Sequence, residues 1–361
     1  MNYQSWIGVA DKNLGYGVML DGFLKTKPAG VSFNPNASVC VYMNPPHLND
    51  TKKVGQYRAA FTMWESDTLP ERFIHWFSQY DQIIAPCQHN VDLFSKYHPN
   101  VSYVPLGIDT SYWKPIKREA NSTFRFHAGG SGWQRKGLDI VVKAFRQLNL
   151  PNAELHIKAP PHAKDTPEEV KGENIYLHRQ WVTQDEMRTW LNQADCFVAP
   201  SRGEGFGLIP LQTIALGIPT IISDTSGQAQ FTHLATGVIS SGKSVSKNFG
   251  GTWDEPKVAE LAEAMLDHYR NDQSVKAKAN AKLATEFSWA NATKKLLDVL
   301  PVGKLLVAPA EEKIVLSLPI RVNKTIKADI GKESFFFDKG LDYTVSEDVF
   351  RILSKSGHLL Q

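Results

Sequence analysis

Short apolar runs alternate with amphipathic stretches along the first part of the chain. The apolar runs that predict β-strands are residues 7–10, 39–43, 59–63, 82–85 and 101–105, and a helical stretch after the fourth reaches Tyr97. Strands that alternate with helices are typical of parallel sheets joined by crossover helices. The pattern therefore predicts an α/β domain over residues 1–115.

The same pattern starts again near residue 124 and predicts a second α/β domain over residues 116–300. Leu138, Val141, Val142, Phe145 and Leu148 recur at the spacing of one helical face. Further strands are predicted at 124–128, 154–158, 174–177, 196–199 and 219–223, and further helices at 187–194, 208–216 and 258–269. A polar run around residues 110–122 separates the two patterns.

The pattern changes after Pro301. Residues 314–322 and 334–337 predict strands, and residues 346–354 predict a short helix. No further strand–helix alternation follows. Residues 301–361 are therefore expected to form a small β-rich appendage.

Composition narrows the classes of protein only slightly. The 361 residues carry 40 Lys and Arg against 37 Asp and Glu, and this small surplus indicates no particular anionic partner. No apolar stretch approaches the roughly 18 residues that a membrane span needs, and the N-terminus lacks the pattern of a signal peptide. Three cysteines without metal spacing are typical of reduced core residues, so we expect a cytoplasmic protein.

The stretch with the clearest chemical character is PSRGEGFGLIPLQ at residues 200–212, between a predicted strand and a helix. Its glycines let the backbone approach a ligand closely, and the following helix offers free N–H groups to an anion. Glu204 is placed to accept hydrogen bonds from sugar hydroxyls, and Gln212 follows two helical turns later. On the residues alone, a glycine-rich connection with a solvated glutamate fits as well.

Two other glycine-containing stretches have the composition of phosphate sites. The first is GGSGWQRKG at residues 129–137, where flexible backbone lies beside Arg135 and Lys136. Donor N–H groups and cations at a strand-to-helix junction suit a pyrophosphate, although an exposed basic loop is the alternative. The second stretch is Gly15-Tyr16-Gly17, which is predicted as a loop before a helix starting at Val18.

Together these segments resemble the retaining, nucleotide-sugar-dependent glycosyltransferases of family 4. The matching pieces are IIAPCQHNVDLF, VPLGIDTSYWKP, FHAGGSGWQRKGLDIVVKAF, ADCFVAPSRGEGFGLIPLQTIALGIPTIISD and FSWANATKKLL, within residues 5–300. The resemblance implies a GT-B fold, in which two Rossmann-like domains face a cleft. The compact chain and its TMWE segment are similar to phage-like members.

The resemblance also implies roles for individual residues. Glu204 matches the acid that contacts the donor sugar, and Lys136 matches the lysine that neutralises the diphosphate. The remaining donor-binding residues that it implies are Gly15, Tyr16, Gly17, Gly130, Arg135, Phe206, Gly207, Leu208 and Gln212.

Three positions depart from the family pattern. Gln212 stands where a second acid normally grips the ribose, and Ser131 stands where an arginine is usual, so Arg135 is a candidate replacement. The usual histidine of the N-terminal domain has no clear match. Glu65 is therefore a catalytic candidate, and His47 and Trp64 are candidates on the acceptor side.

The implied function is transfer of a sugar from a nucleoside-diphosphate sugar, with a UDP-sugar favoured, to a hydroxyl of a glycan, a lipid-linked molecule or a protein. No metal or cofactor is expected, since no Asp-x-Asp motif occurs. One alternative is a DNA glycosyltransferase acting on a hydroxymethylated base. Lys313, Arg321, Lys324 and Lys327 against Asp329 give a local surplus that suits phosphate contacts. The other alternative is a non-catalytic sugar-nucleotide-binding module.

Overall fold

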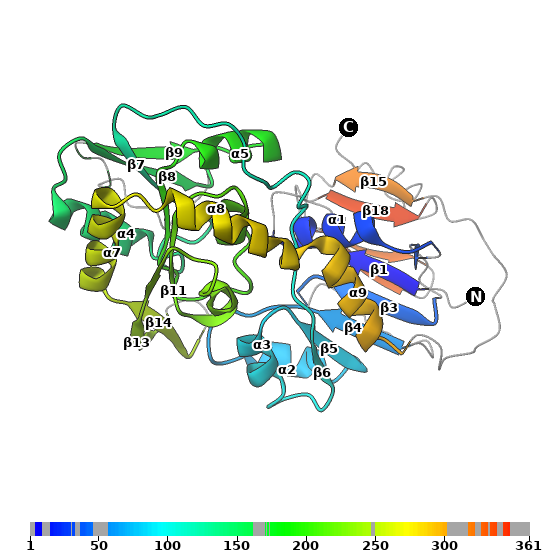
Figure 1. Cartoon of the computed structure of the whole chain (residues 1–361). Coiled ribbons are helices and arrows are strands. Elements are labelled where there is room, and N and C mark those ends of the chain that lie inside the picture. The colour runs from blue at the N-terminus through cyan, green and yellow to red at the C-terminus, as the bar shows by residue number, and fades with distance from the viewer. Residues whose placement is uncertain are drawn as a thin grey trace.

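The computed structural model describes two parallel sheets with helices around them (Figure 1). The described residues are 4–8, 15–29, 31–32, 37–45, 57–161, 170, 172, 174–246 and 250–301, together with the backbone of four later strands. All statements below concern these parts of the chain.

The first sheet has six parallel strands in the order β2-β1-β3-β4-β5-β6. The strands are β1 (Gln4–Gly8), β2 (Val31–Ser32), β3 (Val39–Met43), β4 (Tyr57–Phe61), β5 (Gln82–Ala85) and β6 (Val101–Tyr103). The helices between them are α1 (Gly15–Thr26), α2 (Glu71–Phe77) and α3 (Gln88–Phe94). All four residues of β5 are buried, as expected for a central strand covered on both faces.

The second sheet also has six parallel strands, in the order β12-β11-β10-β7-β8-β9. They are β7 (Phe124–Gly129), β8 (Ala153–Ala159), β9 (Ile175–Arg179), β10 (Cys196–Ala199), β11 (Thr220–Ser223) and β12 (Gly237–Ile239). This is the strand order of a Rossmann domain. From β7, the chain adds strands first on one side of the sheet (β8, β9) and then, starting with β10, on the other side. Ligands of such sheets bind at the carboxyl ends of the strands where the order reverses.

Helices and a hairpin complete the second domain. The helices are α4 (Leu138–Leu148), α5 (Gln184–Asn192), α6 (Leu208–Ala215), α7 (Val258–Arg270) and α8 (Ser274–Leu283), with 3₁₀ turns η3 (Ser226–Phe231) and η4 (Ala284–Phe287). The hairpin consists of β13 (Ser241–Val245) and β14 (Thr252–Pro256), which pair in antiparallel fashion.

The last helix, α9 (Trp289–Val299), returns to the first domain. Trp289 packs edge-on against Phe23, with ring centroids 5.3 Å apart. A Cβ on Gly22 would lie 2.1 Å from the Trp289 indole, so only glycine lets α1 approach this closely. The sequence pattern assigns α9 to the second domain, which was expected to end at residue 300. In the structure α9 packs on α1 of the first domain.

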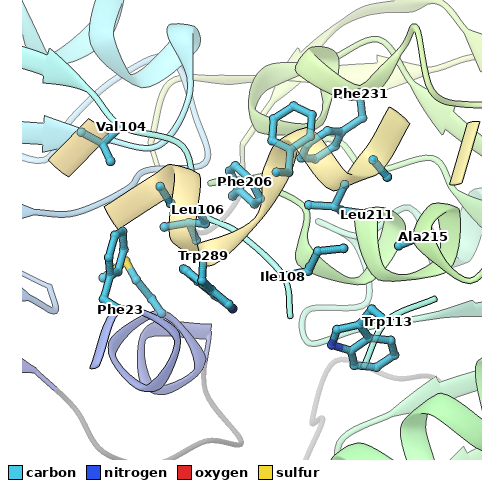
Figure 2. Packing of buried hydrophobic residues seen from close by; sticks show 14 of the residues in the cluster. Phe23, Val104, Leu106, Ile108, Trp113, Phe206, Leu211, Ala215, Phe231 and Trp289 are labelled. Carbon is cyan, nitrogen blue, oxygen red and sulfur yellow. The ribbon is translucent and has the colours of Figure 1, made fainter. Parts of the chain in front are cut away.

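This return joins the two domains through one hydrophobic cluster. Figure 2 shows Phe23, Leu106 and Trp289 at one side of the cluster and Leu211 and Phe231 at the other. Burial of these side chains stabilises the junction, at about 25 cal/mol for each Å² of apolar surface removed from water.

After residue 316 the chain forms two short antiparallel pairs. β15 (Ser317–Arg321) pairs with β18 (Asp342–Ser346), and β16 (Ile326–Ile330) pairs with β17 (Glu333–Phe337). The β-rich tail was thus predicted correctly at the level of backbone. Apart from Ser346, which ends β18, the helix predicted at 346–354 lies outside the described residues.

The predicted α/β class with two Rossmann-like sheets is confirmed. One local prediction was wrong: Gly15, Tyr16 and Gly17 form the first turn of α1, not a loop before it. Glycine costs only part of its helix penalty in a first turn, where backbone N–H groups have no helical partner. The pattern missed α2, α8 and the β13–β14 hairpin, and it also missed the strands β2, β12, β16 and β18.

Candidate functional site

A cavity of about 370 Å³ lies where the two domains meet. Its walls include the loops after β7 and β10 of the second domain, and α1 and the segment after β4 of the first domain. The strands β7 and β10 are neighbours in the second sheet, and the strand order reverses between them. The cavity thus occupies the position where doubly wound sheets bind ligands.

The loop after β7 brings two cations to the cavity. Gly130 has a φ of +141°, and a Cβ there would lie 2.8 Å from Cε of Lys136, so the lysine stem lies against bare backbone. Gly137 has a φ of +67°, and a Cβ there would lie 1.9 Å from the carbonyl oxygen of Pro200. These glycines permit the loop after β7 and the loop after β10 to pack directly on each other.

The loop after β10 places Glu204 against those cations. Lys136 Nζ lies 2.5 Å from Oε1 of Glu204, and Arg135 Nη1 lies 3.5 Å from Oε2. The hydroxyl of Ser201 donates to Glu204 at 2.7 Å, and the Glu204 amide donates to the Ser226 hydroxyl at 2.8 Å. Glu204 is only 4% exposed, so its charge depends on these partners.

Electrostatics keep Glu204 ionised. Burial raises the pKa of Glu204, but the charges of Lys136 and Arg135 and the hydrogen bonds from Lys136 and Ser201 together hold that pKa below its ordinary value. Burial lowers the pKa of Lys136, against the opposing attraction of Glu204. An anionic ligand beside Lys136 would favour its charged form.

The beginning of α6 borders the same cavity. Phe206, Gly207, Leu208 and Gln212 all line it, as the sequence predicts for donor-binding residues. Gly207 has a φ of +102° and starts α6 without a side-chain cap, so the first amides of the helix are available to a ligand. The Gln212 side chain is buried at 8% exposure.

The first domain contributes Gly15, Tyr16 and Glu65 to the cavity wall. The hydroxyl of Tyr16 lies 2.9 Å from the hydroxyl of Thr62 and accepts from the Met63 amide at 3.2 Å, and burial raises the pKa of Tyr16. These bonds join α1 to the segment that carries Glu65. Burial raises the pKa of Glu65; the charge of Arg135 opposes this effect and Glu204 adds to it.

Two of the predicted residues that the structure describes do not line the cavity. Gly17 is buried inside α1. Trp64 is 7% exposed and packs on Phe73, and its indole N–H donates to the carbonyl oxygen of Thr68 at 2.8 Å. Both residues thus serve packing in the first domain. His47 lies outside the described residues.

Sequence reasoning missed one side of the cavity. The further lining residues there include Lys158 from β8, Met187 from α5, and Trp181 and Thr183 from the connection between β9 and α5. Trp181 is 50% exposed, which is unusual for so large an apolar side chain. The capping box of Thr183 and Glu186 was a sequence signal for the start of α5, but no sequence signal places Trp181 at the cavity.

Neither a metal-ion site nor a membrane-spanning helix is found among the described residues. Among them, no group of three or more His, Cys, Asp or Glu side chains is arranged to hold a metal ion. No helix in the described part of the chain is long and apolar enough to cross a membrane.

Comparison with curated proteins finds glycosyltransferases. The chain is 26% identical over 226 residues to the GDP-mannose-dependent monoacylated alpha-(1-6)-phosphatidylinositol monomannoside mannosyltransferase of Corynebacterium glutamicum, which covers 56% of each chain. It is 24% identical over 244 residues to D-inositol 3-phosphate glycosyltransferase 1 of Catenulispora acidiphila, covering 61% of this chain and 54% of the relative. The chain spans about half the length of the curated relatives it matches.

Comparison with solved structures gives the same fold. A UDP-forming trehalose-phosphate synthase from Burkholderia xenovorans superposes with a TM-score of 0.58 at 14% identity, covering 76% of this chain and 75% of that one. TarM of S. aureus, solved with alpha-GlcNAc-glycerol and UDP, superposes with a TM-score of 0.53 at 14% identity, covering 72% and 55%. These likenesses establish the GT-B arrangement of two Rossmann-like domains.

A family model described as Family 4 Glycosyltransferase in conflict systems matches residues 89–296, which is more than half of the chain and includes the loops after β7 and β10. The chain therefore belongs to this family of family 4 glycosyltransferases with the GT-B fold.

Proposed function

We propose that the protein transfers a sugar from a nucleoside-diphosphate sugar to a hydroxyl acceptor, with retention of anomeric configuration. The observation that carries the proposal is the Lys136–Glu204 pair, which is held at 2.5 Å in a cavity of about 370 Å³ between the domains. A partly buried cation and a buried carboxylate, side by side at the strand ends, suit a ligand that has both a diphosphate and sugar hydroxyls.

The second domain holds most of the donor in this proposal. Lys136 and Arg135 neutralise the diphosphate, together with the amides at the beginning of α6. Glu204 accepts hydrogen bonds from the sugar hydroxyls while it stays paired with Lys136, whose ammonium has three donors. Residues 1–115 form the acceptor side, and residues 116–300 form the donor domain, with α9 packed back on α1.

The nucleotide is proposed to be a uridine diphosphate. Two structural relatives have UDP in their titles, although a curated relative is named as GDP-mannose-dependent. Gln212, at the position where the family pattern has an acid, offers the ribose hydroxyls an uncharged acceptor. No metal is required in this proposal, because Lys136 and Arg135 supply the positive charge.

The reaction follows from this placement. The acceptor hydroxyl oxygen attacks the anomeric carbon on the face from which the diphosphate leaves. The bond between that carbon and the diphosphate oxygen breaks, and the hydroxyl proton passes to the leaving diphosphate. Lys136 and Arg135 stabilise the charge that develops on the diphosphate, and Glu204 orients the sugar. Glu65 faces this centre from the first domain and orients the acceptor.

The proposal is tested by a screen of donor turnover with UDP-, GDP- and ADP-sugars. Candidate acceptors are a glycan, a lipid-linked sugar, a peptide and hydroxymethylated duplex DNA. We expect release of nucleoside diphosphate with one donor class, and NMR of the product is expected to give the donor's anomeric configuration. If the protein binds a nucleotide sugar but turns it over with none of these acceptors, the protein is a sugar-nucleotide-binding module and not an enzyme. Inversion would rule out the same-face step.

A further inference from the structure

A single segment of the first domain reaches onto the loop after β10 and onto the hairpin of the second domain. This segment, residues 63–67, is called the arm below. The loops after β7 and β10 are called the donor loops below. A Cβ on Gly205 would lie 2.5 Å from Sδ of Met63, and a Cβ on Gly203 would lie 2.0 Å from the carbonyl oxygen of Glu65. The arm therefore lies directly on the backbone around Glu204.

The end of the arm is hydrogen-bonded to the hairpin. The Thr252 amide donates to Oδ1 of Asp67 at 2.7 Å, and its hydroxyl donates to Oδ2 at 2.5 Å. The Asp67 amide donates back to the Thr252 carbonyl oxygen at 3.3 Å. Three hydrogen bonds between residues 185 positions apart connect the two domains at one point.

The hairpin is in turn tied to the donor loops. Glu255 of β14 pairs with the guanidinium of Arg202, at 2.6 Å from Nε. The Arg202 amide donates to the Arg135 carbonyl oxygen at 2.7 Å, and its carbonyl accepts from the Asp254 amide at 3.1 Å. Arg202 comes two residues before Glu204, so the hairpin and the donor loops form one unit.

The arm is equally well fixed within the first domain. The side chain of Asn90 is fully buried, accepts from the Trp64 amide at 3.2 Å and donates to the Trp64 carbonyl at 2.6 Å. The Tyr16 hydroxyl accepts from the Met63 amide at 3.2 Å. Movement of the first domain relative to the second therefore moves Glu65 relative to the Lys136–Glu204 pair.

We propose that Asp67 is a positioning residue: its bonds to Thr252 hold the two domains in the arrangement that places Glu65 over the Lys136–Glu204 pair. This inference rests on the proposed function for its kinetic consequences only. The nucleoside diphosphate binds to the second domain with or without this contact, whereas turnover requires both walls of the cavity.

The test compares turnover with nucleotide affinity. Asp67→Ala is expected to lower kcat/KM for the donor about 10-fold while the Kd for UDP, measured by calorimetry, changes less than about 2-fold. Thr252→Val removes only the hydroxyl bond and is expected to cost about 3-fold. Asp67→Asn still accepts from the Thr252 amide and is expected to recover most of the loss.

A double substitution and a matched control separate positioning from general damage. Asp67→Ala combined with Thr252→Val is expected to be no worse than Asp67→Ala alone, because both remove the same contact. Asp272 holds Ser274 through the same pair of bonds, amide at 2.8 Å and hydroxyl at 3.0 Å, but within one domain. Asp272→Ala is expected to leave kcat/KM within about 2-fold of wild type.

Amide hydrogen exchange tests the contact without any activity. Asp67→Ala is expected to speed exchange in peptides covering the arm and the hairpin, whereas Asp272→Ala leaves both unchanged. Unchanged exchange in the arm, additive effects of the two substitutions, or a loss of UDP affinity equal to the loss of turnover would each overturn the proposal. If the wild-type protein turns over no donor, the proposed function is wrong. The hydrogen-exchange result would still show whether the Asp67–Thr252 contact holds the two domains together.

Discussion

Glu65 and Glu204 face the same two cations from opposite domains, and their pKa values shift in opposite directions. Burial raises the pKa of Glu65, whereas Lys136 and Arg135 outweigh burial at Glu204 and lower its pKa. Two carboxylates whose environments separate their pKa values take different roles. Glu204 is suited to remain an anion that binds sugar hydroxyls, and Glu65 is suited to keep its proton at a higher pH than an ordinary glutamate does.

Removing the charge of Glu204 should slow the reaction strongly. Glu204→Gln keeps the shape of the side chain and an oxygen for the Ser201 hydroxyl, which lies 2.7 Å away. We expect kcat/KM to fall about 100-fold or more, which is about 3 kcal/mol of transition-state stabilisation. Steady-state kinetics with the selected donor measure this loss.

The matched control is Glu286→Gln. Glu286 is an exposed glutamate that pairs with His233 at 3.0 Å, and neither residue lines the cavity. This substitution is expected to leave turnover within about 2-fold of wild type, as surface changes usually do. Near-normal turnover by Glu204→Gln would remove Glu204 from the residues that act on the sugar.

Glu65→Gln should stabilise the fold at neutral and alkaline pH. The pKa of Glu65 is raised above the ordinary 4.5, so the folded state holds this proton more tightly than the unfolded chain. The stabilisation from the protonated carboxyl is present below 4.5 and is lost as pH rises through the raised value. Glutamine imitates the protonated carboxyl, so its advantage in thermal midpoint should be largest at pH values above the raised pKa of Glu65 and should vanish in acid. An equal midpoint difference at every pH would contradict the raised pKa.

Much of the fold could be predicted because the apolar periodicity is strong in the buried parallel strands. The bounds of β3, β5 and β10 agree with their predicted residues, and all four residues of β10 are buried. The missed β2 has two residues, too few for any period. The hairpin strand β13, with the pattern SGKSV, carries only one apolar residue, so the sequence has no strand signal there.

The site was predictable where glycines and charges are close in sequence, as at residues 129–137 and 200–212. The far wall was not predictable, because Trp181 and Met187 reach the cavity only through the crossover between β9 and α5. The arm illustrates the same limit. Asp67 and Thr252 are 185 residues apart, and neither belongs to a motif.

Gln212→Glu tests how the ribose is held. The Gln212 side chain is 8% exposed and lines the cavity with Glu204. A carboxylate there accepts charge-assisted hydrogen bonds from ribose hydroxyls, which are roughly twice as strong as neutral ones. We expect Gln212→Glu to bind UDP as tightly as wild type or up to about 10-fold more tightly, as measured by calorimetry. A large loss of affinity would mean that the amide N–H groups of Gln212 donate to the nucleotide.

Gly203→Ala tests the close approach of the arm. The added Cβ would lie 2.0 Å from the Glu65 carbonyl oxygen, which is backbone and cannot rotate away. The arm must then retreat from the second domain, so turnover should fall about 10-fold or more because the two walls separate. Gly242→Ala is the control, because the atom nearest to its Cβ would lie 4.0 Å away. Equal kinetics for both variants would show that the arm tolerates displacement.

Removal of residues 313–361 tests the role of the tail and the nucleic-acid alternative together. Within the described residues, the strands of the tail pair only with each other, and the two large sheets are complete without them. The truncated protein should therefore keep donor hydrolysis within about 2-fold, since no catalytic wall is lost. If DNA is the acceptor, the intact protein binds duplex DNA at low salt, the affinity falls steeply as salt rises, and truncation weakens it. Absence of DNA binding by the intact protein would exclude that acceptor, and unchanged binding after truncation would move the nucleic-acid surface onto the first domain. Loss of donor hydrolysis on truncation would instead make the tail a structural part of the catalytic unit.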